Sequence, residues 1–203
     1  MSPLSGFGLS LFAVLFGYLS GSFPTGPLIA RRRGVDLRAV GSGNVGATNA
    51  ARALGKGWGA VVFLGDALKG LLPVLLALFF SPASLAPEAA ALGALLGHLL
   101  PFTLGFRGGK GVATAFGGFV ALSPYAALLS LAAWGGLVLA TKKSSVGSLA
   151  GALLLPPLVW LLSGRPYAWL AAAVAVVLVI ARHKENLSRL WRGKELGVGG
   201  PQQ

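Results

Sequence analysis

The sequence has 203 residues, of which 55% are hydrophobic and only 11% are charged. Soluble globular domains carry about 25% charged residues, so this chain lacks the polar side chains that would cover a globule in water. Apolar runs of about 17 to 25 residues, long enough to cross a hydrocarbon core of about 30 Å, recur between clusters of charge. These features exclude a soluble enzyme and a disordered chain, and they predict an all-α, polytopic membrane helix bundle.

Seven apolar segments predict about seven transmembrane helices. In chain order they are Leu4–Tyr18, Trp58–Phe80, Leu85–Leu104, Val112–Leu122, Pro124–Ala140, Val146–Leu162 and Tyr167–Ala181. The first segment has no basic start of the kind found in signal peptides, so we interpret it as the first span. The fourth segment is short and is followed by Ser123-Pro124, which predicts a helix end and a turn. A re-entrant segment is the alternative for Val112–Leu122.

The 17 basic residues outnumber the 5 acidic ones, which gives a net charge of +12. Such an excess is typical of proteins that bind nucleic acid, an anionic lipid surface or an anionic substrate. Nucleic acid is disfavoured because 15 of the basic residues fall in four short clusters between apolar runs: Arg31–Lys56, Arg107–Lys110, Lys142-Lys143 and Arg182–Lys194. The positive-inside rule places all four clusters in the cytoplasm. This requires a turn at Ser123-Pro124, with the N-terminus outside and the C-terminus inside.

The loops are too short for a second domain, so we expect residues 1–203 to form a single transmembrane domain. Its polar segments lie near residues 41–52, 105–114 and 183–195. The absence of cysteine excludes disulfides, a thiolate nucleophile and thiolate metal ligands. No His/Glu cluster has the spacing of a metal site, and we predict neither a metal nor a cofactor. Most of the 31 glycines are expected to let helices approach closely.

The first polar segment is Gly41–Arg52, with the sequence GSGNVGATNAAR. Its G-x-G-x-x-G pattern matches the dinucleotide fingerprint, but that fingerprint requires a βαβ unit for which this chain has no room. Glycines allow backbone N–H groups to surround an anion, and Arg52 offers a forked donor for phosphate. Neutral hydrogen-bonding side chains accompany it at Ser42, Asn44, Thr48 and Asn49. An ordinary Gly/Asn turn with a surface arginine is the alternative.

The second polar segment contains RGGKG at Arg107–Gly111. One helix is expected to end near Pro101 and another to start after Gly111, so this loop lies at a helix N-terminus, which favours anions. It is not a Walker A loop, because Gly111 stands where Ser or Thr would hold magnesium. A simple positive-inside anchor does not explain three glycines around one lysine. We therefore predict that Gly108, Gly109, Lys110 and Gly111 bind phosphate.

The third polar segment, His183–Arg192, has helical spacing that places His183 and Asn186 near one face, with Arg189 one turn beyond. Two interpretations stand equal. In one, an amphipathic helix lies on the membrane, with the apolar side chains Leu187, Leu190 and Trp191 in lipid. In the other, His183 and its neighbours carry catalysis.

Asp66 and Lys69 lie inside an apolar span, where isolated charges are costly. At spacing i, i+3 they can neutralise each other on one helix face. We favour a structural ion pair that orients the site, with an acid–base role for Asp66 as the alternative. His98, also within a span, is interpreted as a hydrogen-bonded connector between helices.

These segments resemble the three signature motifs of the bacterial acyl-phosphate:glycerol-3-phosphate acyltransferases, the PlsY family. The matching stretches are GSGNVGATNAAR, GHLLPFTLGFRGGKGVAT and HKENLSRL, in the same order and spacing. The apolar segments between them extend the resemblance over nearly the whole chain. Arg107 stands where lysine is common, and Phe102 and Thr103 differ from the usual residues.

The resemblance implies transfer of a fatty acyl group from acyl phosphate to the sn-1 hydroxyl of glycerol-3-phosphate. The products are lysophosphatidic acid and inorganic phosphate, in the first step of bacterial phospholipid synthesis at the cytoplasmic face of the inner membrane. The implied partners are acyl phosphate, glycerol-3-phosphate and membrane lipids, without nucleic acid. The motifs imply catalytic roles for His183, Asn186, Lys110 and Asn44. They imply glycerol-3-phosphate binding by Ser42, Thr48, Asn49, Arg52 and Arg189, and acyl-phosphate binding by Gly108, Gly109, Lys110 and Gly111.

The general base is left open between His183, Asp66 and an oxygen of the substrate phosphate. The imidazole of His183 has an unperturbed pKa near 6.5, which surrounding cations should depress. A small membrane transporter for organic phosphates is the competing hypothesis. It is disfavoured because the polar residues collect at one face and no inverted repeat is visible. A lipid-binding scaffold leaves the glycine-rich segments unexplained.

Overall fold

The computed structural model describes residues 3–198, and every regular element in that range is helical. The longer helices are α1 (Pro3–Gly21), α4 (Lys56–Phe80), α5 (Ala86–Leu99), α6 (Val112–Leu122), α7 (Pro124–Thr141), α8 (Ser144–Leu162) and α9 (Ala168–Arg182). The short ones are α2 (Thr25–Arg31), α3 (Ala47–Leu54), the 3₁₀ turn η1 (Phe102–Leu104) and α10 (Lys184–Trp191). Each of the seven predicted apolar segments forms a helix, so the all-α fold class is confirmed.

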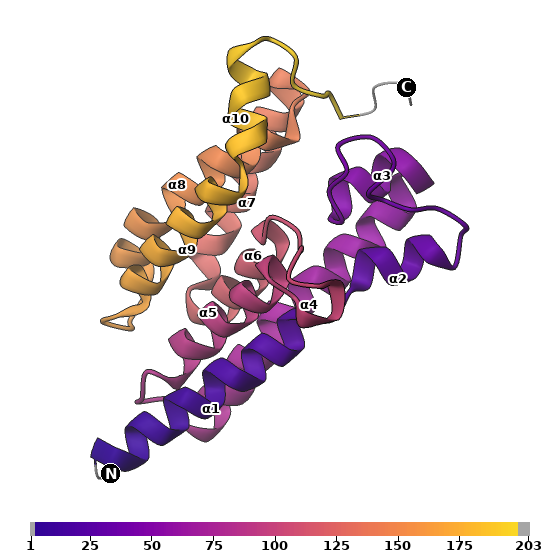
Figure 1. Cartoon of the computed structure of the whole chain (residues 1–203). Helices are drawn as coiled ribbons and strands as arrows, with labels where there is room; N and C mark the ends of the chain where they lie inside the picture. Colours follow the sequence, from indigo (N-terminus) through magenta and orange to yellow (C-terminus); the bar gives the residue numbers. More distant parts are fainter. Residues whose placement is uncertain (1–2, 199–203) are drawn as a thin grey trace.

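The helices form two groups that meet along the middle of the bundle (Figure 1). Helices α1, α4, α5 and α6 pack together in one group, and α7, α8 and α9 pack together in the other. Contacts of α5 with α9 and of α6 with α7 join the groups. Helices α2 and α3 pack on α4, and α10 continues beyond α9.

Glycines at matched positions bring α1 and α5 into direct backbone contact. A methyl group at Gly17 would lie 2.3 Å from the carbonyl oxygen of Ala90, and one at Gly97 would lie 2.1 Å from that of Tyr18. Gly21 and Gly93 complete a G-x-x-x-G pair on each helix and are equally crowded. In lipid, such close packing substitutes for the hydrophobic effect between helices. The expected role of the glycines is confirmed here.

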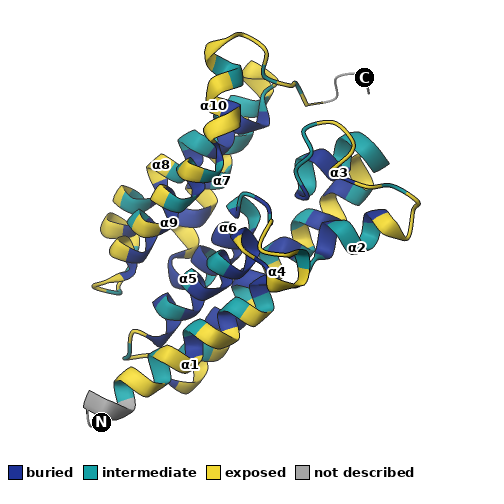
Figure 2. Cartoon of the chain, in the orientation of Figure 1, coloured by how far each residue is buried: buried dark blue, intermediate teal, exposed yellow. Residues whose placement is uncertain are grey.

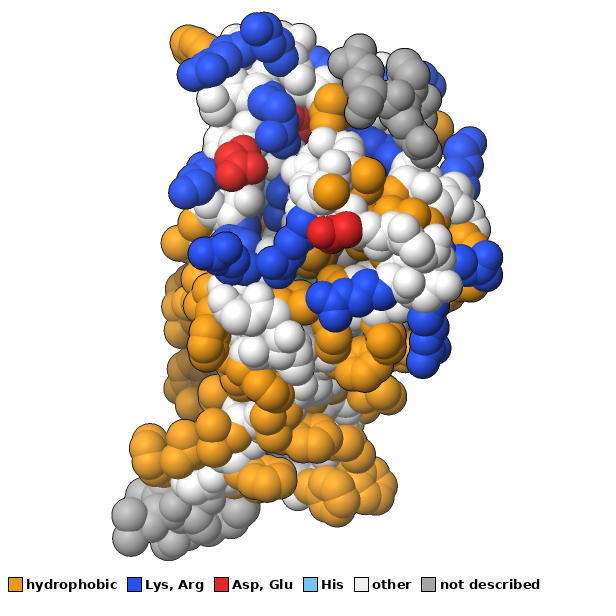
Figure 3. Space-filling model, turned by 45° about the vertical axis from the view of Figure 1, so that its right-hand side comes forward, with side chains coloured by type: hydrophobic (Ala, Val, Ile, Leu, Met, Phe, Trp, Pro, Cys, Tyr) orange, Lys and Arg blue, Asp and Glu red, His pale blue; other side chains and the backbone are white. Residues whose placement is uncertain are grey.

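The chain reverses between α6 and α7 at Ser123-Pro124, as the sequence predicts. Because of this reversal, the Oγ atom of Ser144 at the start of α8 lies 3.0 Å from Oγ1 of Thr48 in α3. The basic residues beside the α7–α8 turn therefore share one end of the molecule with the first two basic clusters. Figure 3 shows Lys and Arg side chains gathered at this end, above a largely hydrophobic body.

A buried ion pair closes the opposite end. The guanidinium of Arg165, in the α8–α9 loop, donates from Nε and Nη2 to the two carboxylate oxygens of Glu88 at 2.7 and 2.8 Å. It also donates to the carbonyl oxygens of Pro82 and Ser84, so one arginine joins three segments. Glu88 is only 6% exposed, and this forked pairing provides the countercharge that its carboxylate needs.

The sides of the helices that face inward are buried (Figure 2), and many large apolar side chains are exposed on the outer surface. Phe79 and Trp160, for example, expose 80% and 67% of their surface. Within the described residues, four segments are long and apolar enough to cross a membrane: Gly6–Arg31, Lys56–Phe80, Pro124–Thr141 and Ser144–Leu162. Helices α5, α6 and α9 have 14, 11 and 15 residues, shorter than a crossing of about 30 Å requires at 1.5 Å per residue. Seven full crossings and the orientation of the termini stay a prediction.

We predict that Arg165→Ala lowers the free energy of unfolding by about 3 kcal/mol, because it leaves the buried Glu88 carboxylate unpaired. Thermal unfolding of the purified protein in detergent measures the change. Arg192→Ala, which removes an exposed arginine at the other end, is the matched control. An equal loss of stability in both variants would contradict this role of the ion pair.

Candidate functional site

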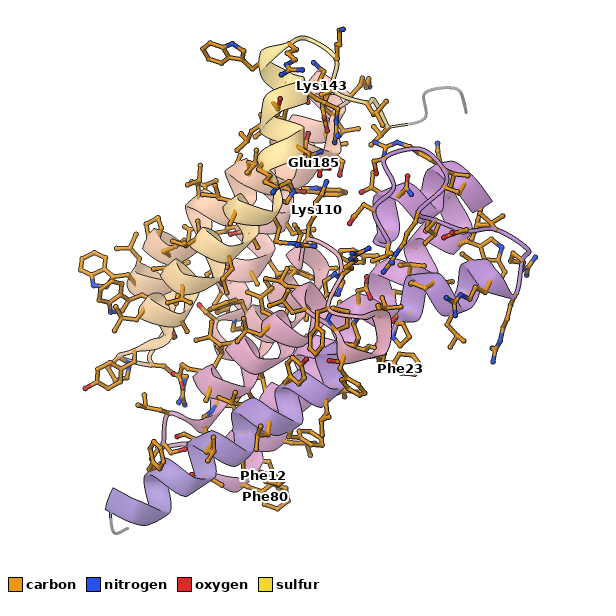
Figure 4. The ribbon with its side chains drawn as sticks, viewed as in Figure 1. Phe12, Phe23, Phe80, Lys110, Lys143 and Glu185 are labelled. Atoms are coloured by element: carbon orange, nitrogen blue, oxygen red, sulfur yellow. The ribbon has the colours of Figure 1, made fainter. Side chains whose placement is uncertain are left out.

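All three sequence motifs meet at one cavity between the two helix groups, at the basic end of the bundle. Figure 4 shows Lys110 and Glu185 at this end, near Lys143 and far from Phe12 and Phe80. The residues of the sequence prediction that line the cavity are Ser42, Asn44, Thr48, Asn49, Arg52, Asp66, Lys110, Gly111, His183 and Asn186. Gly108, Gly109, Lys69 and Arg189 lie outside its lining. The tertiary structure thus gathers most, and not all, of the predicted residues.

Asn49 holds the loop of the first motif in shape. Its Nδ2 donates to the carbonyl oxygens of Leu37 and Val40 at 2.9 and 3.1 Å, and its Oδ1 accepts from the backbone N–H of Ser42 at 2.9 Å. Gly41 has φ +57°, and a methyl group there would lie 2.4 Å from Oδ1 of Asn49. The conformation and the space both require glycine. These bonds give Asn49 a structural role and present the Ser42 side chain to the cavity.

Arg52 reaches across the cavity mouth to the end of the described chain. Its Nε donates to the carbonyl oxygen of Gly197 at 3.2 Å, and its Nη2 lies 3.4 Å from that of Leu196. Burial lowers the pKa of Arg52, Glu195 acts in the opposite direction, and Arg189 lowers it further. The guanidinium remains a cation, because arginine side chains are not deprotonated in proteins. A segment following the third motif therefore touches the first.

The glycines of the second motif seat their loop on the end of α5. The N–H groups of Gly108 and Gly109 donate to the carbonyl oxygens of Leu99 and His98, both at 3.1 Å. A methyl group at Gly108 would lie 2.0 Å from the His98 carbonyl oxygen, and one at Gly109 would lie 2.3 Å from Nε2 of His98. The donors of these two glycines are therefore paired within the protein, and both glycines pack on the end of α5; phosphate binding by this loop stays a prediction.

Lys110 and Gly111 complete the second motif at the cavity wall. Gly111 precedes α6 with φ +80°, and the first residues of the helix, Val112 and Ala113, also line the cavity. The first N–H groups of a helix have no partner within it, so they add positive potential here. Nζ of Lys110 donates to Oδ1 of Asn186. Burial, reinforced by Arg189, lowers the pKa of Lys110 to about 8.

Behind this loop, Lys69 joins α4, the loop between α1 and α2, and α5 through a buried polar cluster. Its Nζ lies 2.9 Å from Oδ1 of Asp66, donates to the carbonyl oxygen of Phe23 at 2.9 Å and lies 3.1 Å from Nδ1 of His98. The three ammonium protons match these three partners in number. The geometry supports the structural ion pair, and it supports His98 as a connector that backs the second-motif loop at Gly109.

His183 faces the cavity from the junction of α9 and α10, with 2% of its surface exposed. Its Nδ1 lies 2.7 Å from the carbonyl oxygen of Val179, so Nδ1 carries a proton and the neutral ring has its acceptor at Nε2. Burial lowers the pKa of His183 to about 4; the Val179 bond acts against this shift and Lys110 adds to it. The imidazole is therefore neutral at pH 7.

The face of α10 that carries Asn186 points into the site, while Leu187 and Trp191 are exposed, Trp191 by 95%. The two sequence interpretations of this segment are therefore compatible. One face builds the cavity, and the apolar side chains on the other remain available to lipid.

Glu195 is the main functional-site residue that the sequence analysis missed. Its side chain is 3% exposed, and its carboxylate accepts from Ser145 Oγ, Asn186 Nδ2 and Arg189 Nε at 2.7, 2.6 and 2.8 Å. Burial by itself raises the pKa of Glu195, but the bonds from Asn186, Ser145 and Arg189 outweigh it and lower the pKa. The sequence did contain a signal for Glu195. It lies close to the third motif, and it is one of only five acidic residues in a chain with a net charge of +12.

Arg182 is a second missed residue. It donates from Nε to the carbonyl oxygen of Gly109 at 3.1 Å and from Nη2 to that of Gly108 at 2.8 Å. The sequence analysis counted it only as part of the basic tail. It ties the end of α9 to the second-motif loop, so it positions Lys110 from outside the cavity.

Beyond its polar mouth the cavity becomes an apolar groove between α6, α7, α8 and α9. Its walls there are formed mainly by small and apolar side chains, namely Ala115, Phe116, Ala127, Leu131, Trp134, Ala152, Leu155, Ala175, Val176 and Val179. A molecule with a charged head and a long apolar chain fits this division.

Comparisons with known proteins agree with this geometry. The family model described as glycerol-3-phosphate acyltransferase matches residues 11–193. The chain belongs to this family. A glycerol-3-phosphate acyltransferase of Geobacter sulfurreducens is 46% identical over 185 residues, which cover 91% of this chain and 95% of the relative. One of Aquifex aeolicus is 46% identical over 188 residues, covering 92% and 97% of the two chains.

Two solved structures of family members share the fold. The integral membrane glycerol 3-phosphate acyltransferase PlsY, in its glycerol 3-phosphate form, aligns with a TM-score of 0.89 and 43% identity over 94% of this chain and 96% of that one. Its lysophosphatidic acid form aligns with a TM-score of 0.86 and 42% identity over 93% and 94% of the two chains. The present protein is accordingly a membrane protein of the acyltransferase class.

We predict that kcat/KM for acylation of glycerol-3-phosphate falls up to tenfold per pH unit above pH 8. Lys110 is a cation below its pKa of about 8 and loses its attraction for phosphate above it, and kcat/KM reports groups of the free enzyme. Substrate phosphate, with a second pKa near 6, is already fully ionised in this range.

The control for this profile is Lys110→Arg, whose guanidinium stays charged at every pH tested. We expect the kcat/KM of this variant to be lower than that of the wild type, because a guanidinium differs in shape from an ammonium group. Its kcat/KM should nevertheless stay constant from pH 7 to 9. The same decline in both proteins would assign the titration to another group.

Proposed function

We propose that this protein transfers a fatty acyl group from acyl phosphate to the sn-1 hydroxyl of glycerol-3-phosphate, releasing lysophosphatidic acid and inorganic phosphate. The observation that carries the proposal is a cavity in which a cationic, hydrogen-bonding mouth opens into an apolar groove. The mouth suits two phosphate groups and the groove suits an acyl chain. Related structures described as the glycerol 3-phosphate and lysophosphatidic acid forms support the acceptor and the product.

The two phosphates are assigned to opposite walls of the mouth. Arg52 and Ser42, on the first-motif wall, bind the phosphate of glycerol-3-phosphate, with Asn44 and Thr48 beside its hydroxyl groups. Lys110 and the N-terminus of α6 bind the acyl phosphate, because this wall leads directly into the groove. Arg189 contributes through its bond to Glu195, which orients Asn186 toward Lys110.

Acyl phosphate is a mixed anhydride with a good leaving group, so positioning carries most of the catalysis. The glycerol-3-phosphate hydroxyl oxygen attacks the acyl carbonyl carbon, and the bond from that carbon to the phosphate oxygen breaks. Holding both substrates in line supplies up to about 7 to 11 kcal/mol in favourable cases. A donor such as Lys110 or Asn186 near the developing oxyanion supplies about 3 to 4 kcal/mol more.

The proton of the hydroxyl group passes to the departing phosphate, while His183 orients the hydroxyl. Nε2 of His183 is an acceptor inside the cavity, but a pKa of about 4 makes it a weaker base than phosphate, whose second pKa is near 6. Asp66 is engaged by Lys69 at 2.9 Å, which disfavours it as the base.

The orientation follows from the positive-inside rule. The end that carries the cavity also carries the four basic clusters, so it faces the cytoplasm, where glycerol-3-phosphate is available. Seven crossings of the inner membrane, with the N-terminus outside, complete this topology. A transporter of organic phosphates is disfavoured, because the buried apolar side chains of Phe119, Val159 and Ala172 pack in the hydrophobic core beyond the groove.

The deciding experiment supplies the purified protein with labelled glycerol-3-phosphate and either palmitoyl phosphate or palmitoyl-CoA in lipid mesophase. We expect lysophosphatidic acid only with palmitoyl phosphate, and almost none from a folded Arg52→Ala variant. Product from palmitoyl-CoA alone would overturn the donor assignment. Counter-flow of glycerol-3-phosphate in proteoliposomes without chemical conversion would favour the transporter.

A second experiment compares two substitutions of His183. We expect His183→Ala to lower kcat by about a hundredfold, and His183→Gln, whose amide also accepts a hydrogen bond, to lower it by about tenfold or less. General-base catalysis contributes a factor of 10² to 10⁴. An equally deep loss of kcat in both variants would therefore identify His183 as the base.

A further inference from the structure

The apolar groove has a closed base. The residues farthest from the polar mouth that still line it are Phe116 on α6, Leu155 on α8 and Ala175 on α9. One turn farther along the same helices, Phe119, Val159 and Ala172 are 0–1% exposed and lie outside the lining. All three belong to the main hydrophobic core, so packed side chains end the groove.

Helix α8 gives the groove its length. Ser144 lies at the mouth, hydrogen bonded to Thr48, and the lining continues down the same face through Ser148 and Ala152 to Leu155. This spacing of three to four residues follows one face of a helix, and eleven residues at 1.5 Å per residue give a depth of about 16 Å. Leu155 thus stands where the far end of a long acyl chain must stop.

The wall on the α7 side of this face is formed by close backbone contacts. A methyl group at Gly147 would lie 2.6 Å from the carbonyl oxygen of Trp134, and one at Gly151 would lie 2.8 Å from that of Ser130. The backbones of α7 and α8 are therefore in close contact here, so these helices cannot approach further. The side chains of Ala152 and Leu155 remain to set the available space.

We propose that Leu155 is the residue that limits acyl-chain length, with Ala152 setting the clearance one turn above it. The inference rests on the proposed function, since it takes the acyl phosphate as the occupant of the groove. The groove is continuous with the cationic mouth and is closed at its base by packed side chains. A chain longer than the groove meets Leu155, and a shorter one leaves apolar surface unfilled.

The test measures kcat/KM for dodecanoyl, tetradecanoyl, hexadecanoyl and octadecanoyl phosphate. We expect Leu155→Ala to raise the value for the octadecanoyl donor relative to the dodecanoyl donor by about tenfold, since each buried methylene adds a factor of about four. The KM for glycerol-3-phosphate should not change. Leu154→Ala, which truncates a neighbouring leucine on the exposed face of α8, should keep the wild-type profile.

Ala152→Leu should shift the profile in the opposite direction, with about a tenfold relative loss for the octadecanoyl donor. The Ala152→Leu variant tests the inference even if Leu155→Ala fails to fold. A wild-type length profile in both variants would overturn the inference and indicate a chain that leaves sideways between helices, while the proposed function stands. Absence of lysophosphatidic acid from wild-type protein with every donor would overturn the proposed function itself, and the inference with it.

Discussion

The candidate site depends on one buried carboxylate. Glu195 accepts hydrogen bonds from Ser145 on α8 and from Asn186 and Arg189 on α10, so it joins the third motif to the start of α8. Through Asn186 it also fixes Lys110, whose ammonium donates to the same amide. A carboxylate this far from solvent is stable only when its partners satisfy it. Arg189 and the two neutral donors satisfy this carboxylate, so its burial produces a rigid connection between α8 and α10.

A second buried polar cluster supports the loop of the second motif from behind. Asp66, Lys69 and His98 link α4, the α1–α2 junction and α5, and the ring of His98 is the surface on which Gly109 packs. Arg182 then holds the same loop from α9. Since the loop is pinned from both helix groups, Lys110 is held at the cavity wall rather than on a mobile turn. Preorganised charge of this kind is what electrostatic catalysis requires.

The division of the cavity into polar and apolar parts explains why the site lies at one end of a membrane bundle. Charged groups cluster where water and headgroups can solvate the substrates, and the groove below them is lined by the same residue types that face lipid. Close helix contacts at Gly147 and Gly151 shape the groove without charged residues, which would be costly at that depth. The charged mouth therefore suits the polar head of an amphipathic ligand, and the packed apolar groove suits its chain.

From the sequence we could predict the membrane class, the seven apolar segments that form helices, the reversal at Ser123-Pro124 and the three polar motifs, because hydrophobic runs, turn residues and charge clusters are local signals. It also predicted the Asp66–Lys69 pair, since i, i+3 spacing is local. Three further features appear only in the folded structure: Glu195 and Arg182 hold the site, Gly108 and Gly109 pack against α5, and Asn49 in α3 supports the first-motif loop. These roles come from contacts such as that of Arg182 with Gly109, which lie 73 residues apart and leave no periodicity in the sequence.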